Sequence, residues 1–144
     1  MIKNIVEALE NIVLLQTGYS KLTHVWDINK NHNTKLEKKY GVSPLSIKEI
    51  NGTTNAITYI QDFMVVLCDR YVHEAQNDNK KQEKVFDLMD KWMLIYKEMI
   101  KSRFNLSNTI ISCKFAKVEK PVFDEDSKTI FLFGTITLLY RDVL

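Results

Sequence analysis

The sequence of 144 residues predicts an α+β fold, with a largely antiparallel sheet packed on one face by a long central helix and an N-terminal helix. Two segments carry apolar residues at helical spacings of three and four, and several others alternate as β-strands do. The strand-like segments are grouped together rather than alternating with helices one by one. This order favours antiparallel pairing over a parallel sheet.

The composition is that of an ordinary globular chain, with a length that suits one domain with its own core. The formal net charge of +2 gives no reason to expect whole-molecule attraction to nucleic acid or to an anionic membrane. No apolar stretch reaches the roughly 18 residues of a membrane span, and no secretory signal is recognisable. We therefore expect a soluble intracellular protein in which Cys68 and Cys113 are reduced and buried.

The first helix is expected over residues 1–17, where apolar residues recur every three or four positions and Gly18 follows in the usual helix-ending position. A short strand is expected over 21–28. Its alternate residues share one face: Leu22, His24, Trp26 and Ile28.

The polar, basic stretch 29–39 indicates a long exposed loop, and Ser43-Pro44 and Asn51-Gly52 are expected to form turns. A strong strand is expected over 56–70. It is apolar on both faces, because Phe63 and Val65 lie on one face and Met64 and Val66 lie on the other.

The second helix, over 79–102, has the clearest periodicity in the chain. Its core stripe is predicted to consist of Val85, Phe86, Met89, Trp92, Met93, Tyr96, Met99 and Ile100. A closing hairpin is expected to follow, with one strand over 108–118, a turn over 121–127 and a last strand over 129–141.

The last strand is the most informative segment, because both of its faces are apolar. One face is predicted to be core: Ile130, Leu132, Gly134, Ile136, Leu138 and Tyr140. The other face carries Phe131, Phe133 and Leu139 among threonines, which is too apolar for a surface left in water. These three residues are therefore candidates for a subunit interface. The alternative is that a strand or loop from 29–50 of the same chain covers them.

The residue types that carry chemistry are scattered. His24, His32 and His73 have no partner at metal-ligand spacing, Cys113 lies within an apolar strand, and the glycines are isolated rather than grouped in a phosphate-binding loop. The sequence therefore predicts no catalytic residue, no cofactor site and no metal site, and we expect a protein that is not an enzyme.

Two charged segments are candidate partner-facing loops. The first contains Lys30, Lys35, Lys38 and Lys39, and the second contains Asp124, Glu125 and Asp126. The basic segment has no arginine, and Tyr40 is its one aromatic neighbour, whereas base readout favours arginine forks and stacking platforms. We therefore expect no specific binding of nucleic acid.

In the order of its elements, its length and its general pattern of apolar and polar residues, the chain resembles the tail terminator (tail completion) proteins of long-tailed bacteriophages. The matching elements are 1–17, 57–70, 80–102 and 130–141, ending in the run Phe-Gly-Thr-Ile-Thr-Leu-Leu-Tyr-Arg. The resemblance implies a homohexameric ring in the virion neck, made in the host cytoplasm, that caps the head-proximal end of the tail tube. Its partners would be the tail tube protein and the head–tail connector or stopper protein. The family has no catalytic or binding signature, so no site residue is carried over.

Three alternatives stay open at this point. One is another head–tail joining or tube-like component. The second is a small-ligand-binding or enzymatic α+β domain with an apolar pocket between sheet and helix. The third is a regulatory nucleic-acid-binding module. The mass of the particle in solution separates the ring from the monomeric alternatives.

Overall fold

The computed structural model describes residues 2–23, 36–71, 79–102 and 110–143. These residues form an α+β fold with two helices and one six-stranded sheet, so the predicted fold class is confirmed. The elements are α1 (Ile2–Thr17), β1 (Ser20–Lys21), β2 (Lys39–Gly52), β3 (Ala56–Arg70), α2 (Asn79–Lys101), β4 (Ile110–Val118), β5 (Val122–Asp124) and β6 (Thr129–Val143). The strand order is β1-β2-β3-β6-β4, with β5 also paired to β6, and only the β1–β2 pair is parallel.

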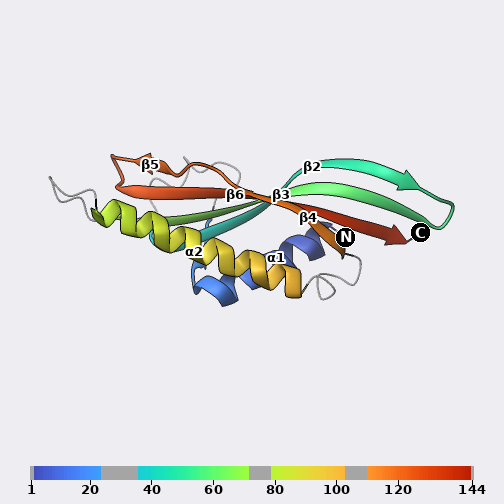
Figure 1. Ribbon diagram of the computed structural model, residues 1–144, viewed down its shortest axis with the longest axis horizontal. Helices are drawn as coiled ribbons and strands as arrows, with labels where there is room; N and C mark the ends of the chain where they lie inside the picture. Colours follow the sequence, from blue (N-terminus) through green and yellow to red (C-terminus); the bar gives the residue numbers. More distant parts are fainter. Residues whose placement is uncertain (1, 24–35, 72–78, 103–109, 144) are drawn as a thin grey trace.

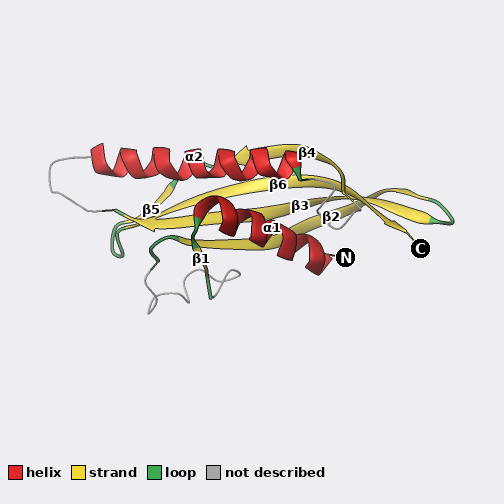
Figure 2. Ribbon diagram, turned by 90° about the horizontal axis from the view of Figure 1, so that it is seen from below, coloured by secondary structure: helices red, strands yellow, loops and turns green. Residues whose placement is uncertain are grey.

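Both helices lie on the same face of the sheet, which we call the core-side face (Figure 1). Helix α1 contacts β2, and the longer α2 contacts β3, β6 and β4, so the two helices lie next to each other across the sheet (Figure 2). The opposite face of the sheet is called the outer face below. The strands β2, β3 and β6 continue beyond the ends of both helices.

The main core lies between the helices and the core-side face. The side chains of β6 predicted to be core are buried there: Ile130, Leu132, Ile136, Leu138 and Tyr140. Gly134 lies under the indole ring of Trp92, where a side chain would collide with the ring. The prediction for this face of the last strand is confirmed.

Strand β3 has the bounds that the sequence predicted. It pairs with β6 along its whole length without a register shift. Its apolar residues therefore divide cleanly between the two faces. Helix α1 ends at Thr17 as expected. Gly18 follows with a φ of 69° and donates its backbone N–H to the carbonyl oxygen of Leu14 at 2.8 Å.

The predicted turn at Ser43-Pro44 is wrong, since both residues lie inside β2 and pair with Met64 and Phe63. Strand β1 pairs with β2 at Lys39 and Tyr40, and within the described ranges no strand other than β3 pairs with β2 at Pro44. An edge tolerates the missing N–H of proline, and the pairing register shifts just after it. The turn predicted at Asn51-Gly52 lies slightly later, over 53–55.

Of the predicted strand over 21–28, the structure describes only residues 21–23, where Lys21 belongs to β1 and the next two residues are not in a strand. His24, Trp26 and Ile28 lie outside the described residues. The predicted loop over 29–39 is also only partly described. Among its described residues, Glu37 and Lys38 are exposed and outside any strand, as predicted, whereas Leu36 is buried and Lys39 begins β2.

The core stripe of α2 is rotated relative to the prediction. Leu88, Trp92, Ile95 and Met99 are the buried residues, whereas Phe86, Met93 and Ile100 are 57%, 55% and 45% exposed. Leu88 and Ile95 were not in the predicted stripe. The helix has more apolar surface than one side needs, and the position of the sheet decides which side is buried.

Candidate subunit interface

The three predicted interface residues lie on the outer face, but they differ in exposure. Phe131 is only 6% exposed and belongs to a second cluster with Leu22, Leu36, Val66 and Cys68. Phe133 is half-buried against this cluster and stacks on Phe131 with ring centroids 6.2 Å apart. Leu139 is half-buried opposite Ile60 of β3.

Phe131 is therefore not an open contact surface, and its assignment to a subunit interface is wrong. Leu22 and Leu36 flank the segment 24–35 in the sequence, and both are packed into the same cluster as Phe131. The chain itself thus covers this end of the outer face, as the alternative interpretation held. Burial of a phenylalanine in this way is worth about 1.5–3 kcal/mol, which favours self-coverage over exposure.

The basic candidates are only partly described. Lys30 and Lys35 lie outside the described residues. Lys38 is exposed with a positive φ of 51°, and Lys39 is half-buried at the start of β2. Lys39 pairs with Cys68 in the strand register, so it belongs to the sheet rather than to a free loop.

The acidic candidates form the turn between β5 and β6. The carboxylate of Asp124 accepts hydrogen bonds from the backbone N–H groups of Asp126 and Ser127 at 3.1 and 3.4 Å. Asp126 is exposed. Glu125 accepts hydrogen bonds from the Tyr71 hydroxyl at 2.8 Å and from the Lys81 ammonium at 2.9 Å. Two of the three carboxylates thus also stabilise the fold locally.

Lys81 joins the acidic turn to the beginning of α2. Its Nζ lies 4.9 Å from the ring centroid of Tyr71 and 5.5 Å from that of Phe123, and it forms the ion pair with Glu125. The hydrogen bond to Glu125 raises the pKa of Lys81 above its ordinary value. This arrangement holds β5, the end of β3 and α2 together.

A first exposed apolar surface lies on α2. The sequence interpretation had assigned its residues to the core. It consists of Phe86, Met93 and Ile100, and we call it the α2 flank. Residues seven apart lie on one line along a helix. Lys84 and Lys91 lie on the opposite side, where Lys84 binds Asp69 of β3 and Lys91 lies 5.8 Å from the ring centroid of Tyr19. The α2 flank therefore points away from α1, toward the β4 edge of the sheet.

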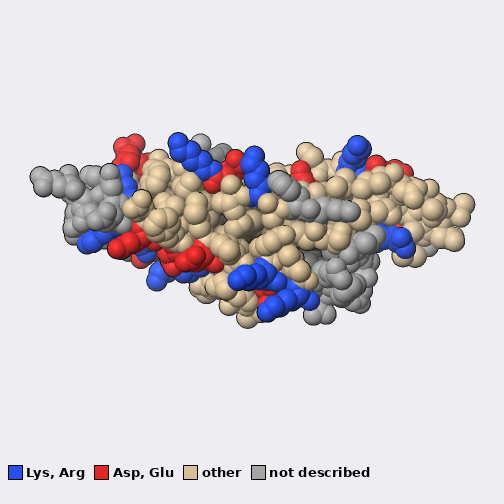
Figure 3. Space-filling view, in the orientation of Figure 1, with Lys and Arg blue, Asp and Glu red and all other residues tan. Residues whose placement is uncertain are grey.

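A second exposed apolar surface lies where the sheet extends past the helices. It is formed by the end of the β2–β3 hairpin and the end of β6, and we call it the blade (Figures 1 and 2). Leu45, Ile47, Ile50 and Val143 are 42%, 47%, 53% and 70% exposed. Most of the surface at this end of the molecule is uncharged in the space-filling view (Figure 3).

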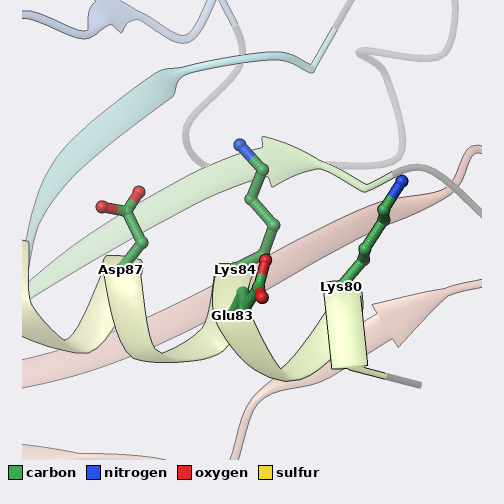
Figure 4. A pocket seen from close by; sticks show the side chains of 4 residues that line it. All are labelled: Lys80, Glu83, Lys84 and Asp87. Atoms are coloured by element: carbon green, nitrogen blue, oxygen red, sulfur yellow. The ribbon is translucent and has the colours of Figure 1, made fainter. Parts of the chain in front are cut away.

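One hollow among the described residues is polar. It has a volume of about 310 Å³ and is lined by Lys80, Glu83, Lys84 and Asp87, all from the first turns of α2 (Figure 4). Ligand sites are usually enclosed and mostly apolar, with polar groups converging from several elements. A hollow lined by one helix with both signs of charge does not have that form.

The polar groups next to this hollow are engaged in contacts within the chain. Asp69 is 1% exposed, accepts a hydrogen bond from its neighbour Arg70 through the backbone N–H at 2.8 Å, and pairs with Lys84 at 3.0 Å. Asp87 pairs with Lys91 at 2.8 Å. Burial, followed by the nearby charges of Asp69 and Asp87, raises the pKa of the Tyr19 hydroxyl. The arrangement connects α2 to β3 and to the end of α1.

The two cysteines lie on opposite faces of the sheet and are not joined in a disulfide. Cys68 is buried on the outer face opposite Phe131, and Cys113 is half-buried on the core side opposite Leu138. Burial raises the pKa of Cys68 to about 12, so its thiol is neutral at physiological pH. Within the described part of the chain, no group of His, Cys, Asp and Glu side chains is arranged to hold a metal ion. The three histidines lie outside that part.

No protein-family model matches this chain, and no curated protein matches it either. Neither α1 nor α2 combines the length and the apolar run that would let a helix cross a membrane. The function must therefore be argued from the surfaces described above.

Proposed function

We propose that this protein is a non-enzymatic structural component of a phage virion neck or tail, resembling the tail terminators. It would form a homohexameric ring that caps the head-proximal end of the tail tube and meets the head–tail connector or stopper protein. The element order supports the proposal, since an N-terminal helix, strands, a long helix and closing strands follow one another as the resemblance requires.

The observation that carries the proposal is that the chain exposes two different apolar surfaces at two different places. The α2 flank points toward the β4 edge, and the blade lies at the far end of β2, β3 and β6. Scattered exposed apolar residues need no explanation, but grouped ones mark contact sites. A twofold dimer uses one self-complementary surface. Two unlike surfaces on one chain instead produce head-to-tail contacts, which form a ring when the rotation between successive copies closes and an open filament when it does not.

The decisive experiment is the mass and shape of the purified protein at moderate salt. Six copies of the 16.9 kDa chain form a particle of about 100 kDa, which sedimentation velocity separates from a monomer. Negative-stain electron microscopy should then show rings with a central opening. A protein that stays monomeric up to millimolar concentration, alone and with tail tubes, would contradict the proposal.

The position on the virion is tested separately. A tagged copy should label one end of each tail, at the side of the head, and its addition should stop elongation of purified tube protein. Label along the whole tail would instead indicate a tube-like component. A monomer whose melting temperature rises with small apolar ligands would favour the ligand-binding alternative.

A further inference from the structure

The sheet is longer than the helix layer that covers it. Strands of 14 or 15 residues span about 46–50 Å, whereas the 16 residues of α1 and the 23 residues of α2 span about 24 and 35 Å. Both helices cover the part of the core-side face that carries the main core. The blade continues this face without a helix of its own (Figure 2).

The uncovered part of the core-side face is apolar. Ile47 pairs with Gln61, whose side-chain amide oxygen accepts a hydrogen bond from the hydroxyl of the core residue Tyr140, so Ile47 lies on the core side of β2. Ile57 and Tyr59 lie on the same face of β3 as Phe63 and are only half-buried. The main core thus ends in an apolar strip that a further helix would complete.

The α2 flank is a helical surface that lacks a sheet. Phe86, Met93 and Ile100 follow one another at intervals of seven residues, or about two helical turns. They lie on the side of α2 opposite its contacts with β3 and α1. We propose that the blade of one copy lies against the α2 flank of the next copy, so that the neighbour's helix completes the helix layer over the blade. This inference rests on the ring proposed above and states which two surfaces meet.

The areas agree with a stable contact. A side chain that is about half exposed offers on the order of 100 Å², so the α2 flank with Ile47 and Ile50 supplies roughly 500 Å². A standard interface of about 1,600 Å² contains about 900 Å² of apolar area. The half-buried Ile57, Tyr59 and Met89 beside the two surfaces add to the total.

The charges also permit the contact. Asp90 and Lys97 lie between the apolar residues of the α2 flank, one helical turn from each. On the blade, Glu49 pairs with Tyr59 and lies on the core-side face, whereas Lys48 pairs with Ile60 and lies on the outer face. The α2 flank thus carries one acid and one base without net charge, so it does not repel the acidic Glu49 of the blade as a whole. A blade that met a second blade would leave the α2 flank in water, whereas the head-to-tail contact covers both surfaces at once.

The test uses one charged substitution in each surface. Ile47→Asp alters the blade and Met93→Asp alters the α2 flank, and both sites are about half exposed, so the core is left intact. Each variant alone should be monomeric, because a buried unpaired carboxylate weakens association by roughly 100-fold or more. Ile50→Asp and Phe86→Asp are second variants of the same two surfaces, and far-UV circular dichroism checks that each variant is folded.

Mixing the two variants gives the sharpest result. The Ile47→Asp chain keeps an intact α2 flank and the Met93→Asp chain keeps an intact blade, so an equimolar mixture should contain heterodimers and nothing larger. Sedimentation velocity resolves the two species. Leu94→Asp is a matched control, since it is the next residue on α2, 47% exposed, and lies off the α2 flank. Leu15→Asp, at an 81% exposed site on α1, is the second control. Both controls should assemble like the wild-type chain.

Three outcomes would overturn the inference. If the wild-type chain forms a ring and either variant still forms one, the two surfaces are not the contact, although the ring proposal stands. If either variant alone forms a homodimer, the remaining surface pairs with itself. If the controls fail to assemble as well, another surface carries the contact. A wild-type monomer would instead contradict the proposed function itself.

Discussion

Replacement of Gly134 by alanine tests the packing of α2 on the sheet. A Cβ atom at this position would lie 2.5–2.7 Å from three atoms of the Trp92 ring, closer than real contacts allow. Trp92 is 5% exposed and belongs to the main core, so a shift of its ring disturbs the residues packed around it. Overpacking of this kind costs about 1–3 kcal/mol, and the loss of glycine freedom in the unfolded chain returns about 0.4–1 kcal/mol.

We therefore expect Gly134→Ala to lower the free energy of unfolding by about 1–2 kcal/mol. For a chain of this length the melting temperature would fall by roughly 3–8 °C. Urea unfolding followed by far-UV circular dichroism measures the loss. Gly52→Ala is the matched control, because its Cβ would lie 2.8 Å from the exposed, flexible carboxylate of Glu49, which is free to turn aside.

A double-mutant cycle identifies the partner. Trp92→Phe shortens the ring, so Gly134→Ala should cost much less in that background, with a coupling of about 0.5–3 kcal/mol. Two results would refute the close packing of Trp92 on β6. One is that Gly134→Ala is as stable as Gly52→Ala, and the other is that Gly134→Ala loses the same free energy of unfolding in the wild-type and Trp92→Phe backgrounds.

Three further predictions concern buried groups. Phe131→Asp should unfold the chain or lower its free energy of unfolding by several kcal/mol, since it places an unpaired charge in the second cluster; a folded, merely dissociated variant in circular dichroism would contradict this burial. Lys84→Met should destabilise by about 1–3 kcal/mol in urea unfolding because it leaves the carboxylate of Asp69 buried without its cation, and Asp69→Asn in the same chain should restore part of the loss. Burial raises the pKa of Cys68 from 9.0 to about 12 and that of Tyr140 from 10.0 to about 12, so both stay protonated in the folded chain when they would ionise in the unfolded one. The free energy of unfolding should then keep its full value below about pH 9 and decrease as the pH rises toward 12. In Cys68→Ala, the midpoint of urea unfolding should depend less on pH between pH 9 and 10 than in the wild-type chain.

The sequence by itself determined the local elements, because hydrophobic periodicity reports which residues leave water together. The bounds of β3, the end of α1 before Gly18 and the core side of β6 could all be predicted from the chain. Each of these depends on neighbours within one element. Strict alternation along β3 and β6 was informative because their pairing has no register shift.

Only the tertiary structure decided what covers each apolar surface. Phe131 and the α2 flank are equally apolar in the sequence, yet Leu22 and Leu36 bury the former while the latter stays exposed. Pro44 remains in a strand because β1 is too short to cover the edge of β2 there. The physical reason is the same in each case. Burial depends on residues that are distant in the sequence, and the periodicity of one element does not tell which distant residues will pack against it.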